Sequence, residues 1–176
     1  DDIIKIGEIL YSYAKYHHLV MPAVAGIPAV GEAIARSLQE RVRYEQGLYI
    51  PLVPLSKITH EDGSREIVPV IPTKEYEPNQ LVLGLDDLAT FADTKIEAVS
   101  RLRQANYIVR DFLVLLDYNF GAADVLAGIA VSLHSIFTVA SVFDYGGEKK
   151  LIPQHYLHAA RVYLATMCAY LKSTAA

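Results

Sequence analysis

The chain has 176 residues, of which 52% are hydrophobic and 20% charged, and its formal net charge at pH 7 is −4. This composition excludes intrinsic disorder, and the length fits one domain over residues 1–176 with a sizeable core. The acidic balance argues against nucleic acid as a partner, because phosphate contacts need a basic face. No apolar run approaches the roughly 20 residues of a membrane-spanning helix, and no signal peptide opens the chain. We therefore expect a cytoplasmic protein with no membrane partner.

The first half of the chain alternates helical and extended patterns. Pro28 suits the first position of a helix, and Pro51 and Pro54 confine the strand that contains them to an edge or irregular position. In chain order we expect a helix over residues 3–18, a buried strand over 19–24, a helix from Pro28, a strand over 48–55, a polar loop or hairpin tip over 56–66, closed by 67–71, and a polar connection over 72–79.

The second half continues the alternation. Thr94 and Glu97 have the spacing of a capping box, and Asn106 can end the following helix in a left-handed conformation. In chain order we expect a strand over 81–85, a helix from Thr94, a central parallel strand over 111–117, a short helix over 122–126, a strand over 131–137, a helix ending near 146–147, and a last helix from Pro153 with Leu157, Leu164, Cys168 and Leu171 inward. This order predicts a doubly wound, mostly parallel α/β sheet flanked by helices.

Two adjacent carboxylates, Asp86 and Asp87, follow the strand over residues 81–85 and precede a helix start. Open α/β sheets bind ligands at the carboxyl ends of buried strands, facing a helix N-terminus. The alternative is a strand-end turn with two solvated carboxylates. Asp93, a few residues further on, is interpreted as a cap of the helix that follows.

Five segments, in order, resemble motifs of the orotate phosphoribosyltransferases, a family with the type I phosphoribosyltransferase fold. The acidic pair and Thr90 resemble the family's signature for phosphoribosyl pyrophosphate (PRPP), in which the acids hold the ribose hydroxyls. The five segments are residues 18–28 (pyrophosphate loop), 57–65 (flexible catalytic loop), 81–94 (PRPP signature), 117–121 (base site) and 128–138 (the segment after it).

The resemblance implies a role for each matching residue. By resemblance the candidates are Asp86, Asp87, Thr90 and Thr94 for PRPP binding; Val24, Ala25 and Gly26 in the pyrophosphate loop; Lys57 and His60 for catalysis; and Asp117 and Tyr118 at the base site. It also implies a place in pyrimidine nucleotide metabolism, Mg²⁺ carried by PRPP as the sole metal, and a homodimer in which each mobile loop completes the neighbour's site.

The same segments depart from the family at positions that carry the chemistry. In the phosphate turn, Phe91 replaces a hydroxyl residue, Ala92 a glycine, and Asp93 a small residue. A Cβ blocks the close approach of an anion to backbone N–H groups, and a carboxylate repels a phosphate. Tyr118 stands where the family has the arginine that reads orotate, and Asp62 adds a negative charge to the loop. The family's N-terminal hood segment is absent from the chain.

These departures favour a catalytically impaired or inactive member that binds a nucleotide-like ligand. Two alternatives stay open: an active PRPP-dependent transferase acting on orotate or another base, and a non-enzymatic nucleotide-binding or subunit-interaction protein. No metal site of the protein's own is expected, since the ligand-type residues 59–62 are interpreted as a solvated loop tip. His134, inside an apolar strand, is interpreted as a hydrogen-bonded core residue.

Overall fold

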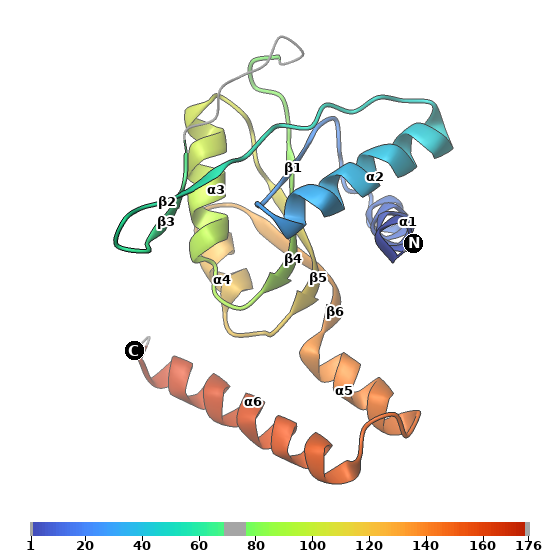
Figure 1. Ribbon diagram of the computed structural model, residues 1–176, viewed down its shortest axis with the longest axis vertical. Helices are drawn as coiled ribbons and strands as arrows, with labels where there is room; N and C mark the ends of the chain where they lie inside the picture. Colours follow the sequence, from blue (N-terminus) through green and yellow to red (C-terminus); the bar gives the residue numbers. More distant parts are fainter. Residues whose placement is uncertain (1, 69–76, 175–176) are drawn as a thin grey trace.

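The computed structural model describes residues 2–68 and 77–174, and a four-stranded sheet lies at its centre (Figure 1). The strand order is β1-β4-β5-β6 and every pairing is parallel, with a separate antiparallel hairpin β2-β3. In chain order the elements are α1 (Asp2–Tyr16), β1 (Val24–Gly26), α2 (Val30–Gln46), β2 (Lys57–Thr59), β3 (Arg65–Ile67), β4 (Leu83–Ala89), α3 (Asp93–Gln104), β5 (Asp111–Asp117), α4 (Ala122–Ala127), β6 (Ser132–Thr138), α5 (Val139–Glu148) and α6 (Gln154–Thr174).

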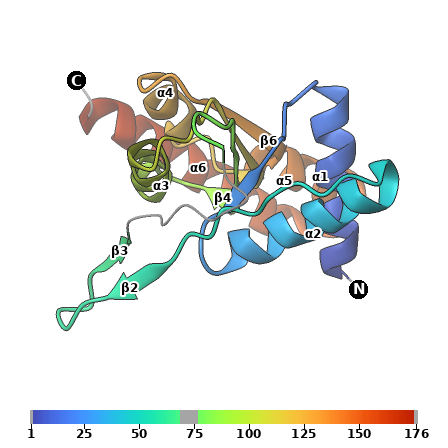
Figure 2. The ribbon, with the colours of Figure 1, turned by 90° about the horizontal axis from the view of Figure 1, so that it is seen from above.

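Helices cover both faces of this sheet, as Figure 2 shows with α1 and α2 on one side and α3 and α4 on the other. Successive residues of a strand point to opposite faces of the sheet, so each central strand contributes side chains to two hydrophobic cores. In β5, Phe112 and Val114 pack in the core that contains α3 and α4, and Leu113 packs in the core that contains α1 and α2. The predicted fold, a mostly parallel α/β sheet flanked by helices, is confirmed.

Three boundaries in the first half differ from the sequence prediction. The first strand covers 24–26 instead of 19–24, because its pairing with β4 begins at Val24. The second helix begins at Val30 instead of Pro28, because the Ile27 N–H still donates to the Leu85 carbonyl at 2.9 Å. Residues 48–55 form no strand. They make a single bridge from Leu52 to Val24, as expected where prolines remove N–H donors.

The second half follows the prediction more closely. The strand over 111–117, the left-handed Asn106 (φ 63°) and the hairpin over 56–66 are confirmed. The short helix is one residue longer than expected, at 122–127, and the last strand begins one residue later, at Ser132. The strand expected over 81–85 is instead β4, which begins two residues later, at Leu83, and runs four residues further, to Ala89, because its pairing with β5 continues that far. Residues 69–76, which include most of the predicted 67–71 and 72–79 segments, lie outside the described residues.

The last helix, α6, lies below the carboxyl ends of the strands in Figure 1. Leu157 is 2% exposed, as predicted for an inward residue, but Leu164, Cys168 and Leu171 are only half-buried. The reason is that α6 packs mainly on α5, to which the Arg161–Asp144 ion pair at 2.6 Å joins it. Within residues 2–68 and 77–174, no helix has the length and apolarity needed to cross a membrane.

Candidate functional site

The carboxyl ends of three parallel strands meet at one edge of the sheet. In the strand register, Ala89 of β4 pairs with Asp117 of β5, and Asp117 pairs with Thr138 of β6. The Tyr118 N–H donates to the Ala89 carbonyl at 2.9 Å, which joins the loop after β5 to the end of β4. The fold therefore brings the predicted PRPP-binding and base-site segments together, although 23 residues separate Thr94 from Asp117.

The two adjacent carboxylates have different surroundings. Asp86 is 9% exposed, and its Oδ2 accepts a hydrogen bond from Lys95 Nζ at 2.8 Å. The same ammonium donates to the Leu88 carbonyl at 2.8 Å and lies 5.8 Å from the centre of the Phe112 ring. Asp87 is half-buried, and its Oδ1 accepts from the Leu88 N–H. Asp87 is thus the carboxylate of the pair that reaches the surface.

Burial raises the pKa of the Asp86 carboxyl, and the Lys95 ammonium acts in the opposite direction. An acid with a raised pKa in the folded state costs stability when it ionises, and the ion pair limits this cost. Asp86 is therefore engaged with Lys95 inside the protein.

Sequence reasoning missed Lys95. Its signal was a lysine in the first turn of a helix, where the macrodipole disfavours a positive charge unless a carboxylate compensates it.

The turn between β4 and α3 carries the altered phosphate signature. Phe91 is 47% exposed, Ala92 is buried, and Asp93 is exposed. Asp93 is the first residue of α3, and Ala92 at the N-cap makes no side-chain hydrogen bond, so the interpretation of Asp93 as a cap is wrong. Its carboxylate accepts no hydrogen bond from the described residues. Thr90, in this turn, and Thr94, the second residue of α3, are both half-buried.

The predicted Thr94–Glu97 capping box is also wrong. The Glu97 carboxylate accepts a hydrogen bond from the Ile67 N–H at 2.7 Å instead of turning back to the start of its own helix. The reason is a tertiary contact. The strand β3 packs on α3, and its Ile67 N–H needs an acceptor, which Glu97 provides.

Three aromatic rings line the same edge of the sheet. The Phe91 and Phe120 ring centres are 6.1 Å apart, and those of Phe120 and Tyr118 are 5.6 Å apart. Asp117, the other base-site candidate, is 6% exposed, and its Oδ1 accepts from the Asn119 N–H at 2.9 Å. The Cys168 thiol of α6 lies 3.8 Å from the Asn119 carbonyl oxygen, so α6 touches this loop. We call Phe91, Tyr118 and Phe120 the aromatic cluster.

The residues predicted for the pyrophosphate loop lie in a strand. Val24, Ala25 and Gly26 make up β1, and the side chains of the first two are buried in the core. A Cβ at Gly26 would overlap the Gly31 carbonyl, so the glycine permits α2 to pack on β1. The loop itself comes after Gly26 and leads into α2.

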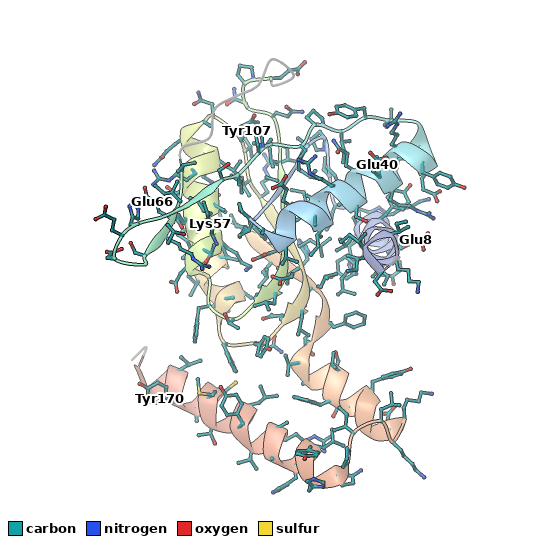
Figure 3. All side chains as sticks on the ribbon, in the orientation of Figure 1. Glu8, Glu40, Lys57, Glu66, Tyr107 and Tyr170 are labelled. Carbon is teal, nitrogen blue, oxygen red and sulfur yellow. The ribbon has the colours of Figure 1, made fainter. Side chains whose placement is uncertain are left out.

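The two catalytic candidates lie on the hairpin. Figure 3 shows Lys57 with Glu66 on the side of the molecule that carries α3, away from Glu8 on α1. The base of the hairpin is held to α3 by Arg101, which donates to the Ile67 carbonyl at 2.8 Å. His60 lies 3.6 Å from Glu66, and Lys57 forms no ion pair within the described residues. Neither residue forms a hydrogen bond or an ion pair with Asp86 or Asp87.

The Nε2 of His134 lies 2.7 Å from Asp111 Oδ1, so the expected hydrogen bond is present, but His134 is half-buried and is not a core residue. Asp111 begins β5, so this pair lies at the end of the strand opposite to Asp117. In the part of the chain that the structure describes, no group of three or more His, Cys, Asp or Glu side chains has the arrangement of a metal site.

The sheet order, the helices on both faces and the strand-end site define the type I phosphoribosyltransferase fold. The UMP synthase of Leishmania donovani superimposes with a TM-score of 0.70 at 20% identity, over 93% of this chain and 33% of that one. The orotate phosphoribosyltransferase of Aeropyrum pernix gives a TM-score of 0.63 at 23% identity, over 81% of this chain and 74% of that one. The Mycobacterium tuberculosis enzyme in complex with PRPP gives 0.57 at 15% identity, over 79% and 74%.

Within that fold class, the chain is related to the orotate phosphoribosyltransferases. The enzyme of this name from Nostoc sp. is 26% identical over 138 residues, which are 77% of this chain and 63% of the relative. The chain thus spans less than two thirds of that relative's length. No family model matches the sequence.

Proposed function

We propose that this protein binds a ribose-containing ligand of the PRPP or nucleotide class at the carboxyl ends of β4 and β5, with little or no phosphoribosyl transfer. The observation that carries the proposal is the pairing of Asp86 with Lys95, which leaves Asp87, half-buried near the carboxyl end of β4, as the carboxylate of the pair that forms no ion pair with the described residues. A carboxylate near the carboxyl end of a parallel strand is suited to ribose hydroxyls, since it accepts hydrogen bonds that they donate.

The positions of the cationic side chains are the reason to expect little phosphoribosyl transfer. The departing pyrophosphate is stabilised by cations fixed near it, and the site's own Lys95 is engaged with Asp86. Lys57 and His60 lie on the hairpin, where His60 pairs with Glu66. In the proposal, any Mg²⁺ enters with PRPP and not through a site of the protein, and the protein acts as a homodimer in pyrimidine nucleotide metabolism.

The test is calorimetric titration of wild type and Asp87→Asn with Mg-PRPP and with uridine 5′-monophosphate (UMP), followed by addition of orotate and quantification of orotidine 5′-monophosphate. We expect binding of at least one ligand that Asp87→Asn weakens about tenfold or more, since it removes a charge-assisted hydrogen bond. Product formed over many turnovers would replace the proposal by an active transferase. Binding that Asp87→Asn leaves unchanged would place the ligand elsewhere.

A further inference from the structure

A cavity opens at the amino ends of β5 and β6, the edge of the sheet opposite to the proposed ribose site. Its volume is about 740 Å³, and the end of α3 and the loop after that helix complete its walls. The lining includes Arg103, Tyr107, Arg110, Asp111 and Ser132. Figure 3 shows Tyr107 at the end of the molecule opposite to Tyr170 of α6, the helix that lies below the carboxyl ends of the strands. The cavity is therefore separate from the proposed ribose site.

Two arginines in this cavity have N–H donors that the described residues do not use. Arg103 donates one hydrogen bond within the described chain, from Nη2 to the Val109 carbonyl at 3.0 Å, and this contact holds its guanidinium at the cavity wall. The Arg110 side chain forms no hydrogen bond or ion pair with the described residues. A guanidinium has five N–H donors and no acceptor, so most of these donors are available to a ligand.

Other arginines of the protein are paired with carboxylates. The nitrogen-to-oxygen distances of these pairs lie between 2.6 and 3.9 Å, and the arginines are Arg36, Arg41, Arg101 and Arg161. Arg43 and Arg65 also form no ion pair with the described residues, but they lie apart from each other, on α2 and β3. Arg103 and Arg110 are thus two unpaired guanidinium groups in one cavity.

The charge of the cavity favours an anion. Asp111 is the carboxylate among the described lining residues, and its Oδ1 lies 2.7 Å from His134 Nε2 instead of pairing with either arginine. With histidine counted as neutral, the described lining has two positive charges and one negative charge, in a chain whose net charge is −4. Like charges in one cavity repel each other, and an anion bound between them removes this repulsion.

We propose that this cavity is a second ligand site, which binds a small phosphate ester that also carries a hydroxyl group. Two guanidinium groups match a phosphate dianion, because each can donate two parallel hydrogen bonds to phosphate oxygens. The exposed Ser132 hydroxyl adds a further donor. Asp111 Oδ2 accepts no hydrogen bond from the described residues, so it is suited to a hydroxyl of the ligand. The volume lies within the range of about 300–1,000 Å³ that small-molecule sites have.

The test is calorimetric titration with glycerol 3-phosphate and with methyl phosphate, at low salt, without Mg²⁺, and at about pH 8, where both esters are dianions. The variants are Arg103→Gln and Arg110→Gln. Arg43→Gln is the matched control, because it removes the same charge from α2, outside the cavity. Each cavity variant should weaken binding of both esters about tenfold or more, since it removes charge-assisted hydrogen bonds, and the control should change it less than about twofold. Wild type should bind glycerol 3-phosphate about threefold or more tightly than methyl phosphate, which has no hydroxyl for Asp111.

A second measurement uses wild type alone, so that it does not depend on the folding of a variant. The NMR shifts of backbone amides on addition of glycerol 3-phosphate should be largest over residues 107–111 and 130–132, and small over 86–94. Four results would overturn the inference: no binding of either ester at millimolar concentration, equal losses in all three variants, equal affinity for the two esters, or the largest shifts over 86–94. The proposed function would stand after any of them, because it depends on Asp87 at the other edge of the sheet.

Discussion

Replacement of Lys95 by methionine tests the buried ion pair at the centre of the site. The Lys95 side chain is 4% exposed and that of Asp86 is 12% exposed, so the substitution leaves a carboxylate buried without its cation. It also removes the donor to the Leu88 carbonyl. Methionine is unbranched and fills similar space against Phe112, so the loss of packing is small. Breaking one side of a buried pair costs about 3–5 kcal/mol, which we expect for the free energy of unfolding at pH 7.

The pH dependence of this loss has a definite sign. The pKa of Asp86 is raised by burial, and removal of Lys95 removes the main influence that lowers it, so the folded-state pKa rises further. Below the unfolded-state pKa of about 3.9, the carboxyl is protonated in both states and ionisation costs nothing. Stability is then lost as the pH rises from there through the folded-state pKa. Lys95→Met should therefore be less damaging at pH 4 than at pH 7.

The assay is urea denaturation followed by circular dichroism at pH 4 and pH 7, with wild type measured under both conditions. Lys95→Met combined with Asp86→Asn serves as the control, because it removes the unpaired charge and should recover at least half of the lost stability at pH 7. Two results would refute the reasoning: a loss of unfolding free energy below about 1 kcal/mol at pH 7, or an equal loss at both pH values. A small loss is what removal of a solvent-exposed ion pair produces.

Three further substitutions test other parts of the structure. Gly26→Ala places a Cβ against the Gly31 backbone and should lower the free energy of unfolding, measured by thermal denaturation, by about 3 kcal/mol. In the control Gly128→Ala the new Cβ meets its nearest atom at 3.2 Å, and the loss should be less than about 1 kcal/mol. Similar losses for the two variants would contradict the packing of α2 on β1. The pKa of Asp62 is lowered chiefly by a hydrogen bond from the Ser64 side chain. Ser64→Ala should therefore raise the Asp62 pKa, measured by NMR titration. An unchanged Asp62 pKa would show that this hydrogen bond is not the cause. Glu97→Ala removes the acceptor of the Ile67 N–H, so hydrogen exchange of that amide should speed up while the β5 amides stay protected; unchanged exchange would show that the hairpin base is held by other contacts.

Much of the fold was predictable because its signals are local. The strand over 111–117 is an apolar run bounded by two aspartates, and its predicted and observed ends coincide. Helical periodicity located the helices, and Asn106 marked the end of one. The motif order pointed to the related family and to the strand-end position of the site. Each of these signals lies within a few residues of the structure that it predicts.

The state of the site depended on contacts between distant residues. Successive residues of β4 point to opposite faces of the sheet, and Asp86, opposite Val114 of β5, is the one that lies against Lys95 of α3. Glu97 had the spacing of a capping box, but its carboxylate accepts a hydrogen bond from the N–H of Ile67, 30 residues earlier in the chain. Phe91 and Phe120 are 29 residues apart and meet because two parallel strands end at one edge.

Sequence alone thus determined the class of fold and the residues present at the site. Only the tertiary structure decided which carboxylate is buried in an ion pair, which is half-buried without one, and which aromatic rings meet at this edge of the sheet. The physical reason is that helix and strand preferences act over a few neighbours, whereas burial and ion pairing depend on which segments the sheet brings together.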